Sequence, residues 1–130
     1  MPSTKLTDAD PTLAAAYTML LQDFRAETGH DLVLTCTYRS TDEQALLYAQ
    51  GRTTPGPCVT QLDGTTHKSK HNVLPSRAVD VAVLVAGKVS WDASQYEPLG
   101  DLAKKYNLIW GGSWTTLKDC PHLELPDGQA

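Results

Sequence analysis

Two histidines and two aspartates have residue types that could form a metal site. Asp80 lies inside an apolar run, residues 78–84, and His71 precedes it by nine positions. His122 follows Asp119 by three positions. A catalytic zinc site takes three protein ligands from His, Asp or Glu and leaves a fourth position for water. His71, Asp80 and His122 can supply these three ligands.

Asp80 has an unusual position for a carboxylate, because the apolar residues around it predict a buried strand. A buried carboxylate without a partner is strongly destabilising, so a positive group should meet it. That group can be a metal ion, or it can be the guanidinium of Arg39 or Arg77. In the second case His122 is a hydrogen-bonded core histidine and the domain is a metal-free binding module. Residue types and spacing leave both interpretations open.

The remaining histidines carry weaker signals. His30 follows Gly29 at a predicted helix end, where an ordinary surface or capping role is expected. His67 belongs to a long loop, and it forms a short basic cluster with Lys68, Lys70 and His71. We expect this cluster to be a solvated loop and not a polyanion site.

Composition is typical of one globular domain spanning residues 1–130. The hydrophobic fraction is 41% and the charged fraction is 20%. A net charge of −4 argues against a nucleic-acid partner and against stable membrane association. Cys36, Cys58 and Cys120 match no zinc-ribbon or redox spacing, so reduced thiols are expected. The first residues show no secretory signal, which predicts a cytoplasmic protein.

The first half of the chain predicts two helices and one strand. Asp10-Pro11 can start a helix that ends at Gly29. Alternating residues predict a strand over 31–39, with Arg39 at the end of its polar face. Ser40 and Glu43 have capping-box spacing, which predicts a second helix up to Gly51.

The second half predicts strands around one more helix. Residues 52–77 read as a long functional loop. A strand over 77–84, a turn at Ala86-Gly87 and a short strand over 88–91 predict a hairpin. Ser94 and Glu97 suggest another capping box, before a helix that ends near Asn107. Short strands are expected over 108–110 and 122–125. The fold class is therefore α+β, with helices packed on a mainly antiparallel sheet.

Three segments together resemble a known enzyme family. They are Tyr38-Arg39-Ser40 with Gln44, Ser69-Lys70-His71 with Ala78-Val79-Asp80, and Asp119-Cys120-Pro121-His122. In this order they resemble the zinc-dependent D-Ala-D-Ala carboxypeptidase and L-alanyl-D-glutamate endopeptidase family, which includes VanY-type enzymes and small phage endolysins and has the Hedgehog/DD-peptidase fold. The chain departs from the common pattern in a longer His71–Asp80 spacing and in Ser76, which stands where the family has glycine.

This resemblance implies roles for individual residues. His71, Asp80 and His122 would bind one zinc ion, and Asp119 would be the general base. Arg39 would polarise the scissile carbonyl or hold a substrate carboxylate, and Ser69 would contact substrate or groups behind the ligands. Glu124 is a rival for the base, and Trp110 and Trp114 are candidates for cleft walls.

The implied function is a zinc peptidase that cuts peptide stems of bacterial peptidoglycan. We expect a monomeric phage endolysin that stays in the cytoplasm until it is released to the cell wall. The alternatives are a D-alanyl-D-alanine carboxypeptidase of cell-wall metabolism and a non-catalytic metal-binding module of the same fold.

Overall fold

The computed structural model describes residues 2–115 and 117–127 and contains three helices and five strands among them. The helices are α1 (Pro11–Thr28), α2 (Thr41–Ala49) and α3 (Pro98–Lys105). The strands are β1 (Asp31–Cys36), β2 (Ala78–Val85), β3 (Lys88–Ser90), β4 (Ile109–Trp110) and β5 (His122–Glu124). Single 3₁₀ turns cover Leu6–Asp8, Lys70–Asn72, Ala93–Gln95 and Gly111–Ser113.

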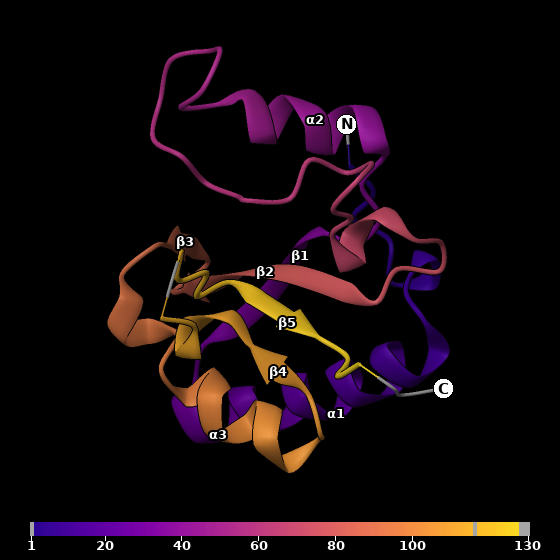
Figure 1. Cartoon of the computed structure of the whole chain (residues 1–130). Coiled ribbons are helices and arrows are strands. Elements are labelled where there is room, and N and C mark those ends of the chain that lie inside the picture. Colours follow the sequence, from indigo (N-terminus) through magenta and orange to yellow (C-terminus); the bar gives the residue numbers. More distant parts are fainter. Residues whose placement is uncertain (1, 116, 128–130) are drawn as a thin grey trace.

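The strands form one antiparallel sheet in the order β1-β2-β5-β4, and β3 pairs with β2 as a hairpin (Figure 1). The central strand β2 is the longest, and it pairs with β1 on one side and with β5 on the other. This architecture confirms the predicted α+β class and the predicted hairpin at Ala86-Gly87.

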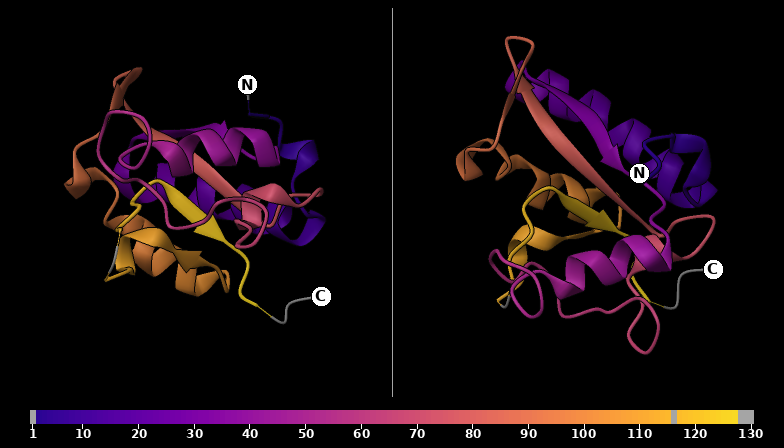
Figure 2. Two further views of the ribbon diagram at one scale, coloured as in Figure 1. Left: turned by 45° about the horizontal axis from the view of Figure 1, so that its top comes forward. Right: turned by 90° about the horizontal axis from the view of Figure 1, so that it is seen from above.

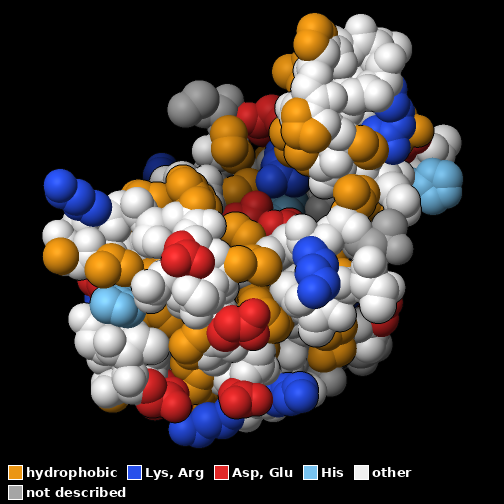
Figure 3. All heavy atoms as spheres, turned by 90° about the vertical axis from the view of Figure 1, so that its left-hand side faces the viewer, with side chains coloured by type: hydrophobic (Ala, Val, Ile, Leu, Met, Phe, Trp, Pro, Cys, Tyr) orange, Lys and Arg blue, Asp and Glu red, His pale blue; other side chains and the backbone are white. Residues whose placement is uncertain are grey.

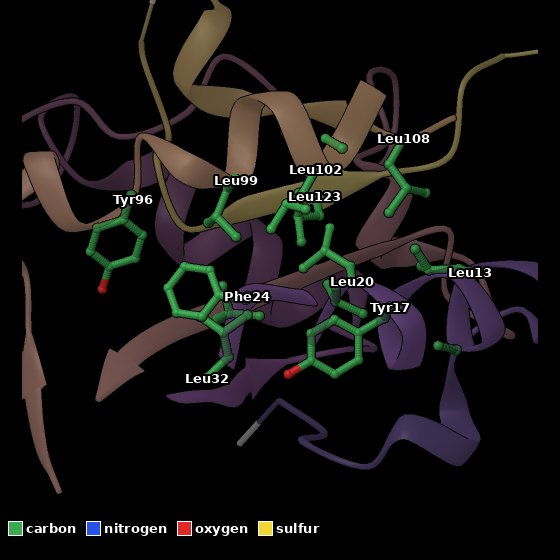
Figure 4. Close-up of a cluster of buried hydrophobic side chains, with 14 of the residues drawn as sticks. Leu13, Tyr17, Leu20, Phe24, Leu32, Tyr96, Leu99, Leu102, Leu108 and Leu123 are labelled. Atoms are coloured by element: carbon green, nitrogen blue, oxygen red, sulfur yellow. The ribbon is translucent and has the colours of Figure 1, made fainter. Parts of the chain in front are cut away.

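The helices cover the sheet unequally. α1 and α3 lie together on one face, whereas α2 and the loop that follows it lie over the other face (Figures 1 and 2). The hydrophobic core fills the space between the sheet and the helices α1 and α3 (Figure 4). Residues that share this core are Leu13, Tyr17, Leu20, Phe24, Leu32, Val79, Val81, Val83, Leu99, Leu102 and Leu123. The opposite face is therefore free to carry polar side chains.

The local signals for α1 and α2 are confirmed. The Asp10 side chain accepts a hydrogen bond from the backbone N–H of Thr12, and Gly29 ends α1 in the left-handed region with φ of 73°. At α2, Ser40 and Glu43 exchange both hydrogen bonds of a capping box. These caps fix where α2 begins, directly after Arg39.

Two expectations about element ends are wrong. Ser94 and Glu97 do not form a capping box: Asp92 caps the 3₁₀ turn Ala93–Gln95, and α3 begins at Pro98, whose ring suits a first helical position. The strand expected over 31–39 ends at Cys36, after a register shift against β2. Beyond it, Thr37 donates its backbone N–H to the carbonyl of Ser3, which turns the chain away from the sheet.

None of the helices in residues 2–115 and 117–127 has the length and apolar composition needed to cross a membrane.

Candidate metal centre

Asp80 and His122 lie side by side on the sheet face that is turned away from the core. Alternate residues of β2, such as Val79 and Val81, point into the core, so Asp80 points to the other face. On β5, Leu123 enters the core and His122 points the other way. The antiparallel register pairs Asp80 with His122 across one strand boundary and with Cys36 across the other.

His71 reaches this position from a short turn in the long loop. The Ser69 side chain accepts the backbone N–H of His71, and the Asn72 side chain accepts the backbone N–H of Ser69, so that a capping box fixes the start of the turn Lys70–Asn72. His71 is 2% exposed. Its Nδ1 lies 2.7 Å from the carbonyl oxygen of Thr37, and its Nε2 lies 3.3 Å from Oδ1 of Asp80.

The tautomer of neutral His71 follows from these contacts. A carbonyl oxygen only accepts hydrogen bonds, so Nδ1 carries the proton and Nε2 presents its lone pair to Asp80. The contact of Nε2 with Asp80 lacks hydrogen-bond geometry, and this buried nitrogen has no hydrogen-bond partner within the described ranges. A lone pair facing a carboxylate oxygen is favourable only with a proton or a cation between them.

His122 shows the same arrangement with its nitrogens exchanged. Nε2 lies 2.7 Å from Oε1 of Glu124, and Nδ1 lies 3.1 Å from Oδ1 of Asp80. When neutral His122 donates Nε2–H to Glu124, the lone pair of Nδ1 faces Asp80. Two imidazole lone pairs therefore converge on one carboxylate oxygen.

The pKa values of these groups reflect the same cluster. Burial opposes protonation of His71, but contacts with Asp80 and Cys36 outweigh burial and raise its pKa to about 10. For His122, Asp80 and Glu124 likewise outweigh burial and raise the pKa. Burial alone would raise the pKa of Asp80, yet His122 and His71 hold it well below its usual range. In the metal-free protein, protons thus neutralise the cluster.

The donor set fits a zinc ion. Imidazole nitrogen and carboxylate oxygen are the ligand atoms that zinc takes in catalytic sites. Ligand atoms of Asp80, Asp119 and His122 lie within 4.8 Å of one another, as do those of Cys36, His71 and Asp80. The Cys36 sulfur lies 3.6 Å from Nδ1 of His71, the nitrogen that is hydrogen-bonded to the carbonyl of Thr37. An ion bound to Nε2, on the opposite side of the ring, would not be shared with this sulfur. His71, Asp80 and His122 do not form one of these groups, but both histidines face Oδ1 of Asp80, so these three residues would hold the metal.

Asp119 stands at the edge of this cluster. Its Oδ2 lies 3.7 Å from Nδ1 of His122, and its side chain is 44% exposed. Burial and the negative charge of Asp80 raise the pKa of Asp119. Its backbone N–H bonds to the carbonyl of Gly111, and a Cβ at Gly111 would lie 2.4 Å from the Asp119 carbonyl oxygen. The Gly-Gly turn therefore allows the acid to approach the sheet.

Arg39 lies on the other side of Asp80. One terminal nitrogen, Nη2, lies 3.4 Å from Oδ2 of Asp80, and the other, Nη1, donates to Oε1 of Gln44 over 2.8 Å. The amide of Gln44, which is 1% exposed, donates in turn to the carbonyl of Leu62 in the long loop. The structure thus brings Arg39 to the candidate metal centre and ties it to the loop. Asp80 therefore contacts Arg39 as well as the two histidines, so both interpretations that the sequence left open find a contact here.

These residues form the floor of a cleft of about 850 Å³ between the sheet and the layer made by α2 and its loop. Figure 3 shows this hollow, with acidic, basic and histidine side chains at its bottom. Trp114 lines the cleft, and its ring centroid lies 4.9 Å from that of His122. Trp110 does not line it: its Nε1 donates to the carbonyl of Cys120, and its ring packs against the core.

The structure also places Ser69, the basic cluster and Glu124. Ser69 lines the cleft while its hydroxyl caps the turn of His71, a structural duty that the spacing alone does not reveal. The basic cluster is not a solvated loop as a whole, because His71 is buried and Lys70 lies 2.6 Å from Glu124. Glu124 also borders the cleft, but its two oxygens contact His122 and Lys70, whereas Asp119 presents a side chain that is 44% exposed.

Known proteins resemble this chain over the segment that carries the candidate site. Residues 63–125, which include His71, Asp80, Asp119 and His122, match the family model described as D-alanyl-D-alanine carboxypeptidase. The chain is 37% identical over 110 residues to the peptidoglycan L-alanyl-D-glutamate endopeptidase CwlK of Bacillus subtilis. That match covers 77% of this chain and 64% of the relative, so the chain spans less than two thirds of CwlK.

A solved structure shares the fold. The L-Ala D-Glu endopeptidase ChiX of Serratia marcescens superposes with a TM-score of 0.69, over 97% of this chain and 90% of ChiX, at 24% sequence identity. The motifs, the converging ligand set and the match to CwlK agree with one another. Residues 63–125 thus match the family of D-alanyl-D-alanine carboxypeptidases, and the chain is similar over 110 residues to an L-alanyl-D-glutamate endopeptidase.

Proposed function

We propose that the chain is a zinc-dependent peptidase that hydrolyses the L-alanyl-D-glutamate bond in the stem peptides of bacterial peptidoglycan. The observation that carries this proposal is the meeting of His71, Asp80 and His122 on one cleft floor, with Asp119 beside them. The substrate is taken from CwlK, the relative with 37% identity, whose name states this bond.

The roles of the residues follow from their positions. A zinc ion held by His71, Asp80 and His122 would polarise a carbonyl and lower the pKa of a water molecule toward neutrality. Asp119 borders the cleft, and its carboxylate, which is 44% exposed, can accept the proton of the attacking water. The same carboxyl group then returns that proton to the amine that leaves. A raised pKa of Asp119 suits the second step, because it makes the protonated form accessible.

Arg39 would bind the substrate. Its guanidinium borders the cleft next to Asp80, and Gln44 fixes its orientation. A guanidinium is always charged and can donate two parallel hydrogen bonds, so Arg39 can hold a carbonyl oxygen or a carboxylate of the peptide. Trp114 covers one side of His122 and limits the access of bulk water.

A second function, D-alanyl-D-alanine carboxypeptidase activity, is favoured by the description of the matching family model. The two activities differ in products: an endopeptidase frees peptides that begin with D-glutamate, whereas a carboxypeptidase releases single D-alanine. The phage origin, the cytoplasmic location and the monomeric state expected from the sequence stay predictions.

The decisive experiment is digestion of purified peptidoglycan, with products identified by mass. Zinc-loaded protein is compared with chelator-treated protein and with Asp119→Asn. We expect peptides with a new N-terminal D-glutamate from the first preparation only, and restored cleavage when zinc is returned to the second. Equal product patterns from all three preparations would refute the proposed function. D-alanine as the main product would replace the endopeptidase with the carboxypeptidase.

A further inference from the structure

Glu124 contacts a candidate ligand and a lysine with separate oxygens. Oε1 lies 2.7 Å from Nε2 of His122, and Oε2 lies 2.6 Å from Nζ of Lys70. The side chains of Glu124 and Lys70 are 13% and 20% exposed, so their ion pair is largely buried and unlike an ordinary surface ion pair. Both oxygens of this carboxylate therefore have defined partners.

The fold determines both contacts. Glu124 is two residues after His122 on β5, and the period of two places both side chains on the same face of the sheet. Lys70 immediately precedes His71 on the capped 3₁₀ turn. Lys70 also donates to the carbonyl of Leu125 over 2.5 Å, so its ammonium group bridges the loop to the end of β5. One turn thus carries the ligand His71 and the lysine that holds Glu124.

The contact with Glu124 decides which nitrogen of His122 faces the cluster. A carboxylate at Nε2 favours the tautomer that is protonated there, and this leaves Nδ1 as the atom with a free lone pair. Nδ1 is also the nitrogen that lies 3.1 Å from Asp80. A rotated or differently protonated ring would present N–H to the metal instead.

We propose that Glu124 and Lys70 are positioning residues for the metal centre: Glu124 fixes the tautomer and orientation of His122, and Lys70 holds Glu124 in place. This inference rests on the proposed zinc site, in which neither residue is a ligand. Glutamine at position 124 has only one acceptor oxygen. If this oxygen faces His122, the NH₂ group meets the ammonium of Lys70, and if it faces Lys70, the NH₂ group meets Nε2–H.

The test measures zinc affinity by competition with a coloured chelator, together with the melting temperature of each metal-free protein. Glu124→Gln should weaken zinc binding about 10–100-fold, and Lys70→Met should weaken it less. The double variant should recover most of the loss of Glu124→Gln, because removal of Lys70 lets the glutamine oxygen turn to His122. The matched control is Lys105→Met, which removes a lysine 2.7 Å from Asp23 on the helical side of the molecule and should leave zinc affinity unchanged.

The outcomes separate this inference from the proposed function. If wild type and Glu124→Gln bind zinc with equal affinity, the positioning roles are overturned but the metal centre is not. A double variant as weak as Glu124→Gln would overturn the role of Lys70. Wild type that binds no zinc would overturn the metal centre and both roles with it. If the affinities change as expected but peptidoglycan stays intact, the positioning roles stand and the peptidase proposal fails.

Discussion

Asp80 and His122 face each other across the β2–β5 pair, with Oδ1 of Asp80 3.1 Å from Nδ1 of His122. The same oxygen lies 3.3 Å from Nε2 of His71. The candidate ligands thus come from a central strand, its antiparallel neighbour and a capped loop turn. Because the sheet fixes two of the three, the site is largely preorganised by the core behind it.

Asp80→Asn should abolish tight zinc binding. The amide keeps the shape of the side chain but loses the negative charge on which both imidazoles converge. We expect zinc affinity to fall by at least about 100-fold, more than for the loss of a group behind a ligand. Metal content of protein purified with limiting zinc measures the effect. Asp101→Asn on the exposed surface of α3 is the control, and retention of zinc by Asp80→Asn would argue against the ligand assignment.

Asp119→Asn should separate catalysis from metal binding. An amide cannot accept the proton of water, so the turnover number should fall about 10²–10⁴-fold. Asp119 is more exposed than the ligands, and zinc affinity should change little. Turnover on a synthetic stem peptide and zinc affinity are measured on the same preparation. Near-normal turnover would assign the base role to another group.

Zinc binding should strengthen as pH rises. The pKa of His71 is raised to about 10 and that of His122 is also raised, so the metal-free protein holds protons on groups that the ion requires deprotonated. Binding must then release protons at neutral pH. Calorimetric titration with zinc in two buffers of different ionisation enthalpy counts them, and we expect a release of about one to two protons at pH 7. No release would show that the histidines are already neutral.

The metal-free protein should become less stable as pH rises. A pKa raised from 6.5 in the unfolded chain to about 10 in the folded one means that the folded state binds the proton more tightly. The resulting stabilisation is complete below pH 6.5 and is lost as pH rises toward 10. Chelated protein should therefore have a lower melting temperature at pH 9 than at pH 6.5, and His71→Gln should reduce this difference.

Much of the scaffold is predictable from the sequence, because its signals are local. The apolar run around Asp80 predicts a buried strand, and the Ser40–Glu43 capping box predicts the start of α2. The resemblance identifies His71, Asp80 and His122, but local patterns do not show that Asp80 pairs with His122. That pairing depends on the register of β2 with β5, which is set by distant contacts.

The supporting residues are harder to predict, since their types are common on protein surfaces. Lys70 and Glu124 are far apart in the sequence, and only the loop turn and the β5 register bring them together. The partner of His71 is the backbone carbonyl of Thr37, for which no side-chain signal exists. The capping box predicted at Ser94 fails because Asp92 and Pro98 provide stronger local signals on either side of it.

Gly111→Ala should displace Asp119, the candidate catalytic residue. Its Cβ would lie 2.4 Å from the Asp119 carbonyl and 3.0 Å from Cβ of His122, and a backbone atom cannot move without its neighbours. We expect both a lower melting temperature and a turnover number reduced at least about tenfold, since small misplacements of reacting groups are costly. In the comparison variant Gly112→Ala, the new Cβ meets the Trp110 ring instead. Equal turnover losses in the two variants would point to general destabilisation.

Gln44→Leu should loosen the loop over the cleft while leaving the ligands in place. Leucine has a similar size but cannot accept from Arg39 or donate to the Leu62 carbonyl, and Gln44 is 1% exposed. Leaving such buried partners unpaired lowers the free energy of unfolding by about 1–3 kcal/mol. Hydrogen exchange should accelerate over residues 59–64, and the Michaelis constant should rise because Arg39 loses its orienting contact. Leu46→Ala, at a position on α2 that is 72% exposed, should change neither quantity. Unchanged hydrogen exchange in Gln44→Leu would mean that other contacts hold the loop. A zinc affinity of Gln44→Leu equal to that of wild type would confirm that the substitution affects the substrate side of the cleft and not the ligands.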